Sequence, residues 1–106
     1  MTINEQDNRF SVLTKRMHNT IISKRGDYAT KDVLSNFKVA GGVCQLSPEM
    51  QCLSAIATKV ARLGVLLSTD SRPNNESISD SVLDLANYAI LLDMLIIDRA
   101  GSKIIF

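Results

Sequence analysis

The sequence predicts an all-α fold: a bundle of three long helices and one short helix, associating as an oligomer. Apolar residues recur at steps of three and four in long segments, which is the spacing of one face of a helix. Two strong helix-start signals, Thr2–Glu5 and Ser47–Glu49, precede such segments. Helix ends are predicted at Gly26 and at the pair Gly41–Gly42. A chain of 106 residues is one domain, so we assign residues 1–106 to a single helical domain.

The first long helix begins at Thr2-Ile3-Asn4-Glu5, a capping box in which Glu5 reaches back to the cap backbone. It runs for about 20 residues to the neighbourhood of Lys24, and Gly26 is the natural stop. Its apolar stripe consists of Phe10, Leu13, Met17 and Ile21. His18 lies beside this stripe, where a single histidine is more often a surface residue than a ligand.

A short helix follows within residues 27–40, started by Thr30 or Asp32 and ended by the Gly41–Gly42 pair. Its apolar residues are Val33, Leu34 and Phe37.

The second long helix starts at Ser47-Pro48-Glu49, with Ser47 as the cap and Pro48 in the first turn. A near-heptad seam runs along it and is expected to pack against another helix of the bundle. The seam residues are Met50, Leu53, Ala57, Val60, Gly64 and Leu67. The stretch Ser68–Asn75 reads as a loop.

The last long helix, Asn75–Arg99, is the stretch around which the chain is organised. A core face is predicted along it, and further leucines and isoleucines leave little room for a solvated side. The core face consists of Ile78, Leu83, Ala86, Ile90 and Met94. We therefore expect a central helix in a symmetric dimer or a higher closed assembly, with the apolar tail Lys103–Phe106 docked on the body or on a partner.

Composition and charge argue against nucleic-acid binding and membrane association. The net charge of +1 and the absence of tryptophan do not suggest nucleic-acid binding. Cys44 and Cys52 form no CxxC motif and indicate reduced thiols, both buried or half-buried, so we expect a cytoplasmic protein. The N-terminus is polar, and the apolar run Ala86–Ile97 is too short for a bilayer, so no membrane association is predicted.

An acidic stripe lies at the start of the last helix. Glu76, Asp80, Asp84 and Asn87 fall within an arc of roughly 80° at about 100° per residue. Carboxylates one turn apart repel, so the stripe needs water, a basic partner face or a divalent cation.

Two interpretations of this stripe remain open. Glu76, Asp80 and Asp84 could hold Mg²⁺, with Lys59 and Arg62 contacting phosphate. Alternatively, Glu76 and Asp80 only favour the helix N-terminus, and Asp84 and Asn87 join Lys59 or Arg62 in a structural network. The spacing by itself favours the second interpretation.

A family resemblance bears on this choice. The segment Glu76–Ala89, ESISDSVLDLANYA, resembles the signature of the nucleotide-modification-associated domain of the first type, found in phages and bacteria. Further matching pieces, in the family's usual order, begin at Lys24 (KxxDYA), Leu34 (LSNFK) and Lys59 (KVARL). The acidic helix is also similar to the second metal-binding helix of the all-α, MazG-like nucleotide pyrophosphatases, which implies Mg²⁺-dependent nucleotide chemistry.

The sequence departs from the pyrophosphatases on the preceding helix. Those enzymes carry a first acidic motif there, whereas this helix has Glu49 as its only acid. We therefore favour a phage-type protein that binds and sequesters a nucleotide or nucleotide-derived signal without turnover, as an anti-defence function would require. Its expected site consists of Lys59, Arg62, Asp84, Asn87, Tyr28, Asn36 and Lys38.

Two alternatives stand beside it. The first is a Mg²⁺-dependent nucleoside triphosphate pyrophosphohydrolase with Glu76, Asp80 and Asp84 on the metal. The second is a helical module that binds a host protein. Tyr28 could equally be a boundary aromatic, and Asn36 a solvated surface residue.

Overall fold

The computed structural model describes residues 1–25, 32–69 and 75–101, the side chains of 75–77 excepted. Within this part of the chain there are four helices and no strand, which confirms the predicted all-α class. The helices are α1 (Ile3–Lys24), α2 (Ser35–Cys44), α3 (Pro48–Ser68) and α4 (Asn75–Arg99). The tail Lys103–Phe106, Tyr28, Gly26 and most of the Ser68–Asn75 loop lie outside the described residues.

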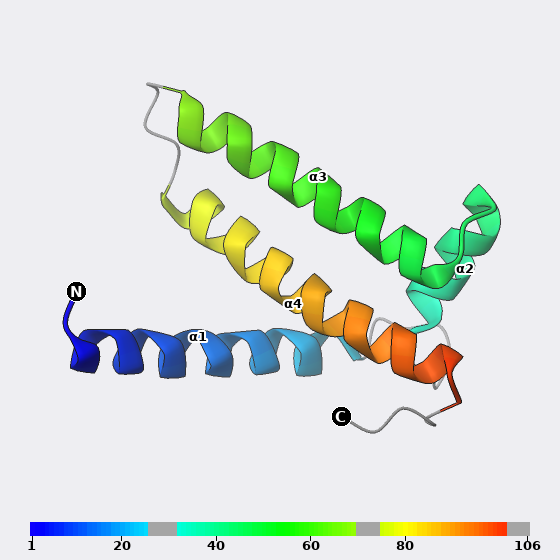
Figure 1. Cartoon of the computed structure of the whole chain (residues 1–106), viewed down its shortest axis with the longest axis horizontal. Coiled ribbons are helices and arrows are strands. Elements are labelled where there is room, and N and C mark those ends of the chain that lie inside the picture. The colour runs from blue at the N-terminus through cyan, green and yellow to red at the C-terminus, as the bar shows by residue number, and fades with distance from the viewer. Residues whose placement is uncertain (26–31, 70–74, 102–106) are drawn as a thin grey trace.

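Helix α4 is central (Figure 1). α3 runs antiparallel beside it and α1 lies on another side, running in the same direction as α4. α2 packs against the start of α3, near the C-terminal end of α4. Among the other helices α1 contacts α4 alone, and none of its residues is buried.

The helix starts are set by the predicted caps. At α1, Glu5 N–H donates to Thr2 Oγ1 (3.1 Å) and Thr2 N–H donates to Glu5 Oε2 (2.7 Å), which is a complete capping box. At α3, Met50 N–H donates to Ser47 Oγ (3.2 Å), and Pro48 occupies the first turn. These short-range bonds satisfy amide groups that a helix start leaves unpaired, so the sequence suffices to place both starts.

The short helix differs from its prediction at its end. Asp32 accepts a hydrogen bond from Leu34 N–H (3.0 Å) and forms the turn that precedes α2. The Gly41–Gly42 pair does not end the helix, which continues to Cys44 and stops where Gln45 adopts a left-handed backbone (φ 58°). Gly41 instead permits a close approach, since a Cβ there would lie 2.7 Å from the Leu46 carbonyl oxygen.

The predicted seam of α3 faces outward rather than into the bundle. All six seam residues, Met50, Leu53, Ala57, Val60, Gly64 and Leu67, are exposed. The packed side of α3 is the adjacent one, which carries the buried Cys52 and Leu63 about 100° around the helix from the centre of the seam. The prediction was wrong because α3 has apolar residues on two sides, and periodicity does not say which side a neighbour will cover.

The predicted core face of α4 is only partly correct. Leu83 is buried and Ile78 and Ala86 are half-buried, but Ile90 and Met94 remain 39% and 40% exposed. The core instead centres on Leu34, Cys52 and Leu95. Partly buried residues pack against this cluster: Phe37, Ile56, Tyr88, Leu91 and Leu92.

A hydrogen bond ties the two long core helices together. Cys52 Sγ–H donates to the Tyr88 carbonyl oxygen at 3.3 Å. Burial raises the pKa of the Cys52 thiol, so the thiol keeps its proton and remains a donor at neutral pH. The buried cysteine is therefore a packing residue, whereas Cys44 is an exposed free thiol.

Candidate functional site

The centre of the candidate site is an ion pair between α3 and α4. Lys59 Nζ lies 2.9 Å from Asp84 Oδ2, and both side chains are largely shielded, with exposed fractions of 26% and 30%. The antiparallel arrangement of α3 and α4 brings these residues together, although 24 positions separate them in the sequence. The sequence expectation that Lys59 lies beside the acidic stripe thus agrees with the geometry.

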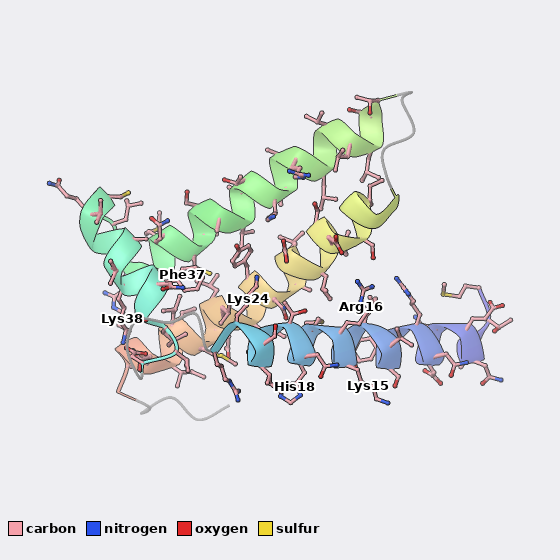
Figure 2. The ribbon with its side chains drawn as sticks, turned by 180° about the vertical axis from the view of Figure 1, so that it is seen from behind. Lys15, Arg16, His18, Lys24, Phe37 and Lys38 are labelled. Carbon is pink, nitrogen blue, oxygen red and sulfur yellow. The ribbon has the colours of Figure 1, made fainter. Side chains whose placement is uncertain are left out.

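The next acid on the stripe has a different basic partner. Asp80 Oδ1 lies 3.7 Å from Arg16 Nη2 of α1, and Arg16 Nη1 donates to Ser79 Oγ at 3.4 Å. Figure 2 shows Arg16 and Lys24 leaving α1 on the side of α4, whereas Lys15 and His18 leave it on the opposite side. Asp80 and Asp84, one turn apart, are therefore neutralised by cations from two different helices.

The described residues contain no cluster of three or more acidic, histidine or cysteine side chains that could hold a metal ion. The Glu76 side chain is not among the described residues, so only two of the three predicted magnesium ligands, Asp80 and Asp84, have a described position. The two described carboxylates, Asp80 and Asp84, each face a basic side chain, which is a poorer setting for Mg²⁺ than a set of free oxygens.

One turn beyond Asp84, Asn87 presents a buried amide. The residue is only 5% exposed, and neither its Oδ1 nor its Nδ2 has a hydrogen-bond partner among the described residues. An unpaired buried amide costs about 1–3 kcal/mol, so a folded protein usually satisfies such a group. The amide lines a recess of about 30 Å³ between α1 and α4 that is lined by Thr20, Ile21, Lys24, Asp84, Asn87, Tyr88 and Leu91.

This recess adjoins a larger pocket to which all four helices contribute. The pocket has a volume of about 320 Å³, which lies at the lower end of the range for small-molecule sites. Its lining residues are Lys24, Asn36, Phe37, Ala40, Gln51, Ala55, Tyr88 and Leu91. Lys24, Tyr88 and Leu91 line both spaces, and we call the two together the convergent pocket.

The convergent pocket combines an aromatic wall with a cation. The rings of Phe37 and Tyr88 meet edge to face, with centroids 6.2 Å apart, and form a fixed apolar surface. Lys24 is the last residue of α1 and lines the pocket. No carboxylate of the described residues lies within ion-pair distance of Lys24. Since Lys59 already neutralises Asp84, Lys24 leaves the convergent pocket with a net positive charge.

The remaining predicted site residues are dispersed. Asn36 lines the convergent pocket. Arg62 is exposed on α3, and Tyr28 lies outside the described residues. Lys38 is placed elsewhere, where its Nζ bridges Asp32 (2.5 Å) and Asp98 (2.9 Å) and ties α2 to the end of α4.

A cavity of about 370 Å³ beside Lys38 is larger than the convergent pocket but less suited to recognition. Its charged groups are already used, because Lys38 pairs with Asp98 and Arg99 Nη1 lies 3.0 Å from Glu49 Oε2. An incoming ligand would have to break these pairs, whereas Asn87 and Lys24 offer groups that have no such partner among the described residues.

Sequence reasoning missed most of the lining residues of the convergent pocket, among them Lys24, Gln51 and Tyr88. Asp84, Asn87, Tyr88 and Leu91 follow the i, i+3, i+4, i+7 spacing of one helix face, which is a signal for Tyr88. Lys24 begins the KxxDYA piece of the family resemblance, but that piece does not assign it to a pocket, and Gln51 carries no local signal. Only the packing of α1 and α3 around α4 brings the two residues to the same place.

Comparison of the chain with protein-family models, with curated proteins and with solved structures finds no match.

Proposed function

We propose that this protein binds a nucleotide or a nucleotide-derived small molecule in the convergent pocket and retains it without turnover, as a phage sponge for such a signal would. The observation that carries the proposal is the buried amide of Asn87, which has a donor and an acceptor with no partner among the described residues. The proposal keeps the ligand class implied by the sequence resemblance of Glu76–Ala89 to the nucleotide-modification-associated domain, a family whose model the chain does not match.

The chemistry of the pocket suits the parts of a nucleotide. An asparagine amide can both donate to and accept from the edge of a base that carries an acceptor beside an amino group. The recess at Asn87 is large enough only for an exocyclic group, so the ring itself would occupy the larger pocket beside Tyr88 and Phe37. Lys24 would neutralise a phosphate.

Two features favour retention over hydrolysis. Hydrolysis in the all-α pyrophosphatases needs acids on two helices, and the only acid of α3, Glu49, pairs with Arg99 near the C-terminal end of α4. Asp84 is paired with Lys59 and Asp80 with Arg16, so a metal would have to displace both cations. Should Mg²⁺ bind, Glu76 and Asp80 are the residues that would hold it.

The test is calorimetric titration of the whole chain with nucleoside phosphates, cyclic dinucleotides and ADP-ribose derivatives, with and without Mg²⁺, followed by analysis of each ligand. We expect binding of at least one compound, recovered intact. Release of phosphate or pyrophosphate that Asp80→Ala abolishes would establish the hydrolase instead. Absence of binding to every compound would contradict the proposal and direct the search to protein partners.

Asn87→Leu sharpens the test because leucine is similar in size and has no polar atom. We expect affinity to fall about 10- to 100-fold and the free energy of unfolding without ligand to rise by about 1 kcal/mol, since an unpaired buried amide is removed. Asn19→Leu, at an exposed position of α1, is the matched control and should change neither. Loss of stability in Asn87→Leu would show that the amide has a structural role.

A further inference from the structure

The outward face of α3 carries the most regular apolar pattern of the chain, and the described residues leave it uncovered. Met50, Leu53, Ala57, Val60, Gly64 and Leu67 follow alternating steps of three and four and fall within an arc of about 100°. Every one of them is exposed, with Val60 at 52% and Leu67 at 69%. The space around Gly64 is open, since a Cβ placed there would meet nothing within 4 Å.

Little charge lies on this half of the helix. Lys59 and Arg62 lie outside a half-turn of about 180° centred near the seam. Glu49, in the first turn of α3, lies at the edge of the seam arc and pairs with Arg99 of α4. Between and beside the seam residues stand small or apolar ones, including Ser54, Ala61 and Val65. A solvated helix face normally carries charge, so this pattern is typical of a helix–helix interface.

The size of the molecule supports the same conclusion. A monomer of 11.6 kDa is expected to expose about 5,800 Å², whereas this chain exposes 7769 Å². The radius of gyration is 15.9 Å, against about 13 Å for a compact domain of this length. The excess area of about 1,900 Å² is more than twice the roughly 800 Å² that each partner contributes to a standard interface.

We propose that the α3 seam is the contact surface of a homodimer, in which α3 of a second copy of this chain packs on the same six residues about a twofold axis. An isologous contact needs a self-complementary surface, and an uncharged seam is complementary to itself. Small residues at Ala57 and Gly64 allow the two helices to approach closely. This interface is independent of the nucleotide proposal and does not require the convergent pocket to be occupied.

A membrane is the competing occupant, because α3 is long and apolar enough to cross one by length and composition. Spanning would carry the Lys59–Asp84 ion pair into hydrocarbon, which is unfavourable. Helices that lie in a membrane surface usually have lysines and arginines along a solvated polar side. α3 has only two cations, and Lys59 pairs with Asp84, so Arg62 is its single exposed cation and we favour a second copy.

Sedimentation equilibrium of the whole chain tests the proposal, with Val60→Glu and Gly64→Leu as seam variants. Both should raise the dimer dissociation constant at least tenfold while helical content by circular dichroism stays unchanged. Gly64→Leu is the sharper variant, since the single chain has open space there and leucine favours a helix. The matched control is Ile96→Glu on α4, with 42% exposure, and it should leave the dissociation constant unchanged.

Three results would overturn the proposal. The first is a wild-type chain that stays monomeric at the highest soluble concentration. The second is dissociation by Ile96→Glu with no effect of the seam variants, which would place the interface on α4. The third is flotation of a monomer with phosphatidylcholine–phosphatidylglycerol vesicles that Val60→Glu abolishes, which would assign the seam to a lipid surface.

Discussion

At the scale of single residues, the most informative positions are those whose surroundings contradict their type. Asn87 is polar and buried, whereas Val60 and Leu67 are apolar and exposed. Burial of an unpaired amide and exposure of aliphatic surface both cost free energy, so each indicates a molecule that the single chain does not contain. The two proposals above rest on these positions and call for a ligand and for a second copy.

The neighbouring glycines of α2 give a residue-scale prediction with an internal control. A Cβ at Gly41 would meet the Leu46 carbonyl oxygen at 2.7 Å, whereas one at Gly42 would meet nothing within 4 Å. We expect Gly41→Ala to lower the free energy of unfolding by about 1–3 kcal/mol through this clash. Gly42→Ala should raise it by about 0.5–1 kcal/mol through helix propensity.

Urea denaturation of the two variants, at equal protein concentration, checks this prediction. If Gly41→Ala is as stable as the wild type, the turn between α2 and α3 can move away and the close approach has no structural role.

At the scale of elements, two ion pairs between half-exposed side chains add to the buried contacts of Leu34 and Phe37 that hold α2. Lys38 pairs with Asp32 and Asp98, and Asp32 also accepts from Leu34 N–H. The hydrogen bond from Lys38, followed by that from Leu34, lowers the pKa of Asp32 below its usual 3.8. The hydrogen bonds that the Lys38 ammonium donates to Asp32 and Asp98 raise the pKa of Lys38 above 10.5.

These shifts set the pH range over which the anchor stabilises the fold. The contribution of Asp32 is fully present above pH 3.8 and is lost as pH falls through its lowered pKa. The contribution of Lys38 is fully present below pH 10.5 and is lost as pH rises through its raised pKa. We expect thermal stability to be flat between these limits and to fall outside them.

The variant Asp32→Asn tests the loss of thermal stability that we expect at acidic pH. The variant should be less stable than the wild type at pH 7 and should lose less stability on acidification, because its side chain does not titrate. Asp93→Asn, at an exposed position of α4, should retain the wild-type profile. Melting temperatures measured between pH 2 and pH 7 decide the point, and identical acid limbs for all three proteins would contradict it.

Helix α1 is the least firmly held element. It contacts only α4, through half-buried residues such as Leu13, Met17 and Ile21, and has no buried residue. Few buried apolar contacts mean a low free energy of local opening. We expect native-state hydrogen exchange to show weaker amide protection in α1 than in the facing parts of α3 and α4.

A ligand in the convergent pocket should raise the amide protection of α1 relative to that of α3 and α4. Lys24 lies at the end of α1, so occupancy of the pocket would hold α1 against α4 and slow exchange in its last turns. Protection in α1 equal to that in α4 without any ligand would show that another surface covers α1.

At the scale of the whole molecule, the chain is incompletely packed. The fully buried side chains with the largest volume are only Leu95 and Cys52 within the described residues, and α3 and α4 both keep apolar faces in solvent. So small a core provides limited stability by burial, and the second copy proposed above would add the missing area.

The melting temperature should therefore depend on protein concentration. For a dimer that unfolds to separate chains, each tenfold increase in concentration adds about 1.4 kcal/mol to the free energy of unfolding. We expect the midpoint to rise by a few degrees per tenfold increase in the wild type. In Gly64→Leu the midpoint should be constant, and calorimetry at three concentrations provides the measurement. A constant wild-type midpoint would contradict this expectation.

Local sequence was sufficient for the helices themselves. The bounds of α4 were predicted to the residue, the start of α3 follows from Ser47 and Pro48, and the capping box at Thr2 begins α1. These features depend on hydrogen bonds and backbone preferences within four residues, which the sequence contains in full. The Lys59–Asp84 pairing was one of the contacts that the structural interpretation of the acidic stripe offered, with Lys59 or Arg62 as the partner. That interpretation needs only that α3 run antiparallel beside α4.

Tertiary structure alone decided which faces are buried. Periodicity shows that Met50 and Val60 share one side of α3, but the adjacent side, with Cys52 and Leu63, is the one that packs. On a helix with two apolar sides, the choice depends on the shapes and positions of its neighbours, which no local pattern contains. The packing of the helices around α4 likewise separates Lys38 from the convergent pocket and brings Lys24 and Asn87 together in it.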